Sequence, residues 1–134
     1  MSRKMEYTGR YSLSRFEYGY AKWYSLKYNE WLEEYNSLKD SLNGVGFSEA
    51  VQGGKGSNPT ERLGARRAEL RNKMLKVEHA AWEAGEDIAK YILIAVTNED
   101  VTFEVLERKY HIPCGRTLFY ERRRKYYYLL SKEI

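Results

Sequence analysis

Basic side chains crowd the C-terminal segment of this 134-residue chain. Residues 116–134 carry six Lys and Arg against two Asp and Glu, and this local excess of +4 equals the formal net charge of the whole chain. A basic segment of this kind indicates a polyanion or an acidic partner. The alternative is a helix face whose charges are simply solvated.

The spacing of elements around this segment is typical of a helix-turn-helix. A short helix is predicted from Thr102 to Tyr110, with Thr102 as N-cap, and a longer one over residues 114–132. A short turn, His111-Ile112-Pro113, separates them, and a helix over 86–96 would support the pair. In such a motif the second helix presents its first turn to the major groove. The sequence therefore predicts a DNA-binding module.

Position along the second helix divides the side chains into two groups. Its first turns would read base edges, and the basic run behind them would bind phosphates. The predicted base contacts are Arg116, Thr117 and Tyr120, and the predicted phosphate contacts are Arg122, Arg123, Arg124 and Lys125. A plain helical hairpin with solvated arginines is the alternative.

Other chemistries find little support in the sequence. The glycines around Lys55 lack the spacing of a phosphate-binding loop and the strand that precedes one, so they indicate a linker. His111 and Cys114 have the spacing of half a zinc site, but only His79 is left as another soft ligand. A nucleophilic Cys114 would need a base held by a third group. We expect no enzyme, no metal and no cofactor.

The elements that position this module all show helical periodicity, so the chain is predicted to be all-α. Apolar residues spaced by four and three indicate a long first helix from Ser14, with Ser14 and Glu17 as a capping box and Asn43-Gly44 as its end. Its stripe contains Tyr24, Tyr28, Trp31, Tyr35, Leu38 and Leu42.

A second long helix is expected to pair with the first as an antiparallel hairpin. It would begin at Asn58-Pro59 and end at Gly85, with an apolar stripe interrupted by Arg67. The predicted organisation is a flexible N-terminal arm over 1–13, the hairpin over 14–85 with a Gly-rich linker over 44–57, and the helix-turn-helix module over 86–134.

Aromatic residues in the N-terminal part exceed what one thin hairpin can bury. The stripe is interpreted as the core of the hairpin, and the alternative is that it forms an intermolecular surface. One short recognition helix reads few base pairs, so we expect a homodimer formed through the N-terminal helices.

Two segments resemble those of a known family. Ile112-Pro113-Cys114-Gly115-Arg116, with residues 119–130, resembles the C-terminus of phage and prophage regulators of the RinA/ArpU type, and residues 53–61 resemble their linker. The resemblance implies a late-gene or packaging-gene activator of phages of Gram-positive bacteria. Its C-terminal helix-turn-helix would be similar to the sigma-factor segment that reads the promoter −35 element.

The function expected from the sequence is therefore a sequence-specific, double-stranded DNA-binding transcription regulator of phage origin that contacts host RNA polymerase. The alternative is a phage-encoded interaction module that binds a host protein or ribonucleoprotein. No apolar run approaches the roughly 20 residues that a bilayer requires. We thus expect a cytoplasmic protein without a membrane partner.

Overall fold

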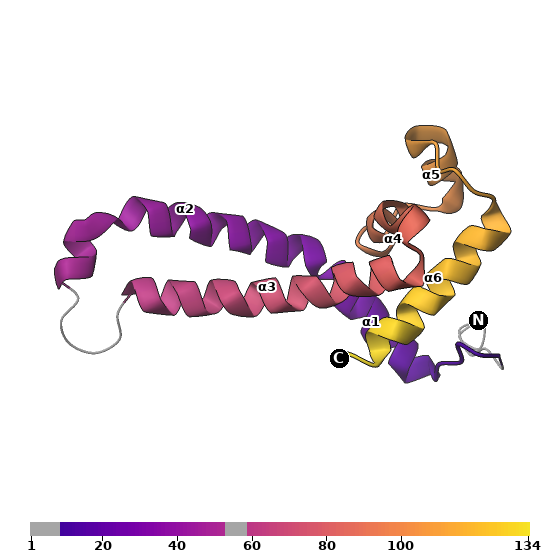
Figure 1. Ribbon diagram of the computed structural model, residues 1–134, viewed down its shortest axis with the longest axis horizontal. Helices are drawn as coiled ribbons and strands as arrows, with labels where there is room; N and C mark the ends of the chain where they lie inside the picture. The colour runs from indigo at the N-terminus through magenta and orange to yellow at the C-terminus, as the bar shows by residue number, and fades with distance from the viewer. Residues whose placement is uncertain (1–8, 53–58) are drawn as a thin grey trace. The chain divides into compact units, whose positions relative to one another are not determined.

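The computed structural model describes residues 9–52 and 59–134, which contain helices and no strand. The prediction of an all-α chain is confirmed for these residues. The elements, drawn in Figure 1, are α1 (Arg15–Leu26), α2 (Tyr28–Gln52), α3 (Pro59–Ala84), the 3₁₀ helix η2 (Glu86–Ile88), α4 (Ala89–Val96), α5 (Phe103–Tyr110) and α6 (Arg116–Ser131).

The long N-terminal helix begins as predicted but is interrupted at Lys27. The Ser14 side chain accepts from the Glu17 amide at 3.1 Å, and the Glu17 carboxylate accepts from the Ser14 amide at 2.9 Å, which confirms the capping box. At Lys27 the backbone amide bonds to the carbonyls of both Trp23 and Tyr24 at 3.2 Å. The predicted single helix is thus α1 followed by α2.

The predicted stop at Asn43-Gly44 is wrong, because α2 continues to Gln52. A glycine costs a helix only about 1 kcal/mol and does not by itself end it. The predicted linker over 44–57 is therefore helical in its first part, and residues 53–58, including the expected N-cap Asn58, lie outside the described residues.

The described residues divide into two compact units. One contains residues 29–52 and 59–75, and the other contains residues 9–28 and 76–134.

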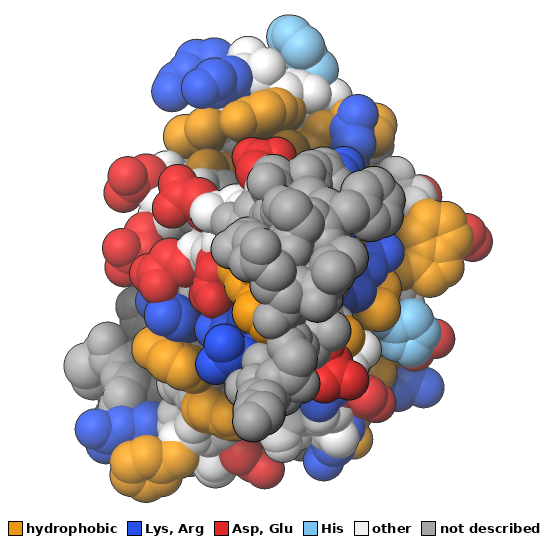
Figure 2. All heavy atoms as spheres, turned by 90° about the vertical axis from the view of Figure 1, so that its left-hand side faces the viewer, with side chains coloured by type: hydrophobic (Ala, Val, Ile, Leu, Met, Phe, Trp, Pro, Cys, Tyr) orange, Lys and Arg blue, Asp and Glu red, His pale blue; other side chains and the backbone are white. Residues whose placement is uncertain are grey.

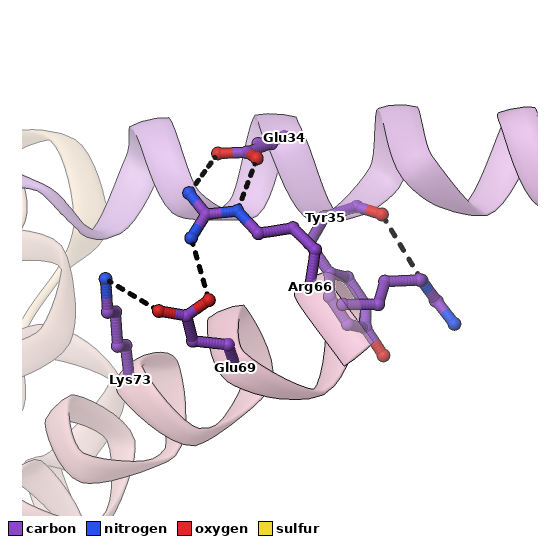
Figure 3. A network of polar contacts seen from close by, with 6 residues as sticks. Glu34, Tyr35, Arg66, Glu69 and Lys73 are labelled. Atoms are coloured by element: carbon purple, nitrogen blue, oxygen red, sulfur yellow. Dashed lines mark hydrogen bonds and ion pairs between the residues drawn. The ribbon is translucent and has the colours of Figure 1, made fainter. Parts of the chain in front are cut away.

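In the unit of residues 29–75, α2 and α3 form an antiparallel pair. Arg66 on α3 forms a bidentate ion pair with Glu34 on α2, with N–O distances of 2.7 and 2.9 Å (Figure 3). The same guanidinium donates a hydrogen bond to the Glu69 carboxylate at 3.0 Å. Nearer the start of α2, the Nζ atom of Lys73 on α3 lies 5.4 Å from the centre of the Trp31 ring. The lower-numbered residue on α2 faces the higher-numbered residue on α3, so the two helices run in opposite directions.

Arg67 interrupts the apolar stripe of α3 without disturbing the pair. Its guanidinium lies 4.0 Å from the centre of the Tyr35 ring, and its Nε donates to the Tyr35 carbonyl at 3.4 Å. The aliphatic stem and the flat guanidinium cover the ring as an apolar residue would. Arg67 is therefore part of the aromatic packing.

In the other unit, α1 packs against α6 and α4. Tyr18 meets the Tyr127 ring edge-on at 5.1 Å, and Ala21 is completely buried. Residues 9–13, which the sequence placed in a flexible arm, join this contact: Leu13 is buried, and the Tyr11 ring lies 5.5 Å from the Tyr128 ring. The N-terminal helix thus contributes to the core that holds the C-terminal helix.

A buried polar contact joins these helices across 101 residues of sequence. The hydroxyls of Ser25 on α1 and Tyr126 on α6 are 2.7 Å apart, and both residues are completely buried. The Ser25 hydroxyl donates to the Ala21 carbonyl at 2.8 Å, so the Tyr126 hydroxyl donates to Ser25. Each hydroxyl is satisfied by this arrangement, as buried polar groups require.

Helix α5 and the connection to α6 are fixed at both ends. The Thr102 side chain accepts from the Val105 amide at 3.4 Å, as the sequence predicts for an N-cap. At the other end His111 adopts the left-handed conformation with φ 54°, and Ile112 turns its side chain into the core while its amide bonds to the Leu106 carbonyl at 3.2 Å. This arrangement resembles the helix endings in which a left-handed residue precedes an apolar contact.

We expect His111→Val to destabilise the unit by about 1–2 kcal/mol, because a β-branched residue is strained at positive φ. His111→Gly is expected to preserve or slightly raise stability, since glycine adopts this conformation freely and the histidine side chain is exposed. Urea unfolding of the two variants checks this, and equal midpoints for valine and glycine would contradict it.

Within the part of the chain that the structure describes, no helix is long and apolar enough to cross a membrane.

Candidate nucleic-acid interface

The first turn of α6 is open to solvent. Its N-cap, Gly115, offers no side chain to the helix, and Gly115, Arg116 and Thr117 are all exposed. The first amides of a helix have no partner within it, and the helix dipole makes this end positive. The turn therefore combines amide donors, a hydroxyl and a guanidinium at one place.

Arg116 is held by α5. Its guanidinium forms an ion pair with Glu104 and lies 5.4 Å from the Phe103 ring. The contact raises the pKa of Arg116 and lowers the pKa of Glu104. Both side chains are at least half exposed (57% and 50%), so the pair is a surface contact of small net free energy that a stronger acceptor can replace.

Arg122 points in another direction, towards Gly85 and Asp87 after the end of α3. It forms an ion pair with Asp87 at 2.9 Å, which lowers the pKa of the Asp87 carboxyl. The guanidinium passes over Gly85, where any side chain would collide with it. This arginine, a predicted phosphate contact, thus joins α6 to the start of η2.

The predicted phosphate contacts do not form one surface. Successive residues of a helix are rotated by about 100°, so four in a row point in four directions. Arg123 lies against the rings of Tyr120 and Tyr127, at 4.9 and 5.9 Å, and not beside Asp87 as Arg122 does. All four predicted phosphate contacts, Arg122, Arg123, Arg124 and Lys125, are half-buried.

Tyr120 is also half-buried, with its ring edge-on to Phe119 at 5.0 Å. Of the three predicted base contacts, the structure therefore leaves Thr117 and Arg116 exposed and packs Tyr120 partly into the domain.

Sequence reasoning missed Glu121. It is exposed and lies one turn after Thr117, so both side chains leave the same side of α6. A carboxylate there accepts hydrogen bonds, for instance from the amino group of cytosine, and repels phosphate. The spacing of four from Thr117 was the available signal.

Cys114 is half-buried beside this turn, and burial raises the pKa of its thiol. Cys114 precedes the N-cap of α6, outside the first turn where the helix dipole would lower the pKa of a thiol, and the nearby Asp87 carboxylate raises this pKa further. The thiol is therefore a weak nucleophile. In residues 9–52 and 59–134, no three His, Cys, Asp or Glu side chains gather where they could hold a metal ion.

Charges of both signs lie on the face of the molecule shown in Figure 2, with apolar side chains exposed between them.

No known protein family, curated protein or solved structure matches the chain.

Proposed function

We propose that α5, residues 111–115 and α6 form a helix-turn-helix that binds double-stranded DNA, and that the protein is a sequence-specific transcription regulator. The observation that carries the proposal is the exposed first turn of α6, where an uncapped helix end stands next to Arg116 and Thr117. Amides at this end suit a phosphate, and an arginine reaches the N7 and O6 atoms of guanine.

The Arg116–Glu104 pair fits this role as a resting contact. Glu104 holds the guanidinium beside the first turn in the free protein. A guanine edge offers two acceptors in the fork geometry that arginine prefers, and it replaces the carboxylate on binding. Arg123 and Arg124 would reach the phosphate backbone from their places on α6, while Arg122 would mainly hold α6 in place through Asp87.

The wider role that we propose follows the resemblance to RinA/ArpU-type regulators: a phage activator of late or packaging genes that contacts host RNA polymerase. A twofold dimer would present two copies of α6 and double the base pairs read. We place the dimer contact in the unit of residues 29–75, where Leu32 on α2 and Leu75 on α3 are exposed.

We expect Arg116→Ala to weaken binding to a preferred duplex by about 1–3 kcal/mol and to relax the preference at one base pair. Arg123→Ala is expected to weaken all duplexes alike and to lower the salt dependence by about one unit. Full-length protein would select its preferred duplex from a random library, and anisotropy titrations would compare it with unselected DNA.

Lys39→Ala is the matched control, since Lys39 is an exposed basic residue on α2. It should leave both affinities unchanged. The proposal predicts that the selection yields a duplex bound at least about 10³-fold more tightly than random DNA. If it yields none, the proposal is contradicted and a protein or ribonucleoprotein partner is favoured. If Arg116→Ala leaves the preference for the selected duplex over random DNA unchanged, the first turn of α6 does not read the bases as we propose.

A further inference from the structure

Helix α1 has a second face, which its packing against the described residues of its own unit leaves exposed. Phe16, Tyr20 and Trp23 follow one another at spacings of four and three, which places them on one side of the helix. Their exposed fractions are 81%, 51% and 54%. The residues that face the core of the unit are Ala21, Tyr24 and Ser25, on the other side.

The exposed rings are ordered. The rings of Tyr20 and Trp23 are nearly parallel, with an interplanar angle of 12° and centres 6.0 Å apart. From Phe16 to Trp23 the helix rises about 10 Å. This length matches about three stacked bases at roughly 3.4 Å per nucleotide.

Basic side chains accompany the rings. Arg15 lies 5.7 Å from the centre of the Phe16 ring, and Lys27 lies 5.9 Å from that of Trp23. Lys22 is exposed on the same helix. The acidic residue of α1, Glu17, turns its carboxylate back to the Ser14 amide at 2.9 Å. The surface thus pairs flat rings with positive charge.

We propose that this surface of α1, formed by Phe16, Tyr20 and Trp23 with Arg15, Lys22 and Lys27, binds single-stranded nucleic acid. Aromatic side chains stack on bases of any sequence, and neighbouring cations bind the phosphates. A second copy of the same helix fits less well, because it would bring the same three positive charges against one another. The proposal does not rest on the role of α6.

The test uses the full-length protein and a fluorescein-labelled dT12 oligonucleotide in anisotropy titrations. Binding is expected to weaken as salt rises, with a log–log slope of about −2 for three phosphate contacts. Phe16→Ala and Trp23→Ala are each expected to weaken binding about fivefold or more, whereas Trp23→Phe keeps a ring and most of the affinity. Lys22→Glu should lower both the affinity and the salt slope.

Trp82→Ala is the matched control, since Trp82 on α3 is equally exposed (55%). It should bind dT12 like the unmodified protein, as should Arg116→Ala, which tests double-stranded binding separately. Absence of dT12 binding at tens of micromolar protein in 50 mM salt would overturn the proposal. Equal affinities of the Phe16, Trp23 and Trp82 variants would do the same. If the Phe16 and Trp23 variants lose self-association and the protein does not bind dT12, the surface belongs to a second copy.

Discussion

Removal of residues 1–28 is expected to abolish the cooperative unfolding of the unit that contains α4, α5 and α6. This segment supplies α1, which packs against α6 and contacts the buried Tyr126 and Tyr127 through Ser25 and Tyr18. Without α1 the buried hydroxyl of Tyr126 also loses its partner Ser25. Truncation of one buried aromatic side chain costs about 3–5 kcal/mol, and loss of α1 removes Tyr24 from the core and exposes Tyr126 and Tyr127, so the total is comparable with the whole stability of an ordinary domain.

Thermal unfolding followed by circular dichroism checks this expectation, with point variants as controls. Ala21→Asp places a charge at a completely buried position of α1 and should destabilise the unit by about 3 kcal/mol or more. Phe16→Asp changes an 81% exposed position of the same helix and should alter stability by about 0.5 kcal/mol at most. A cooperative transition in the shortened chain would show that α1 is dispensable.

The protein is expected to unfold at alkaline pH, between about pH 10 and 12, because of buried tyrosines. Burial raises the pKa of Tyr126 and of Tyr127 well above the ordinary value near 10. Both stay protonated in the folded chain while the unfolded chain loses their protons. Their contribution to stability is complete below pH 10 and falls by about 1.4 kcal/mol per pH unit for each residue above it.

Together the two tyrosines lower the free energy of unfolding by about 5 kcal/mol between pH 10 and pH 12, which is comparable with the whole stability of many domains. Tyr24, whose pKa burial raises to about 12, acts in the same direction. Urea unfolding at several pH values measures the slope. Tyr127→Phe should make this slope shallower by about 1.4 kcal/mol per pH unit, which is the contribution of one proton. A folded protein with unaltered urea midpoint at pH 12 is the result that would refute the expectation.

Local signals in the sequence were sufficient to predict most helix starts and the helical class. Ser14 with Glu17, and Thr102, each bond amides a few residues away, and a pattern of this range can be recognised without knowing the fold. The end of α2 could not be recognised in this way. Gly44 permits a helix to stop but does not require it, and the choice depends on interactions beyond the neighbouring residues.

The partner of α1 could not be predicted from periodicity. The stripe that contains Tyr24 and Tyr28 shows which side is buried but not what covers it. The burial of Ser25 could not be predicted from its neighbours in sequence, because its hydroxyl pairs with that of Tyr126, 101 residues further along the chain. For the exposed side of α1, the sequence indicated only that the N-terminal part has more aromatic residues than a thin hairpin can bury.

For the candidate site, the sequence predicted a helix close to the position of α6, but it did not indicate which contacts the arginines of this helix make in the folded chain. A run such as residues 122–125 suggests one cluster, but helix geometry separates its members. Arg122 is used for the Asp87 pair and Arg123 lies against tyrosine rings. The acidic partners, Asp87 and Glu104, stand on elements that only the fold brings near.

The pairing of α1 with α6 also has a consequence for the way the chain folds. Its contacts join residues about 100 positions apart, such as Ser25 and Tyr126, and contacts of such high sequence separation slow folding. At about 5–20 residues per second, a ribosome needs roughly 5–20 s to add the residues between them. Throughout that interval the inner face of α1, with Ala21, Tyr24 and Ser25, lacks its partner α6. The nascent chain is therefore a substrate for chaperones or proteases until translation has passed Tyr126.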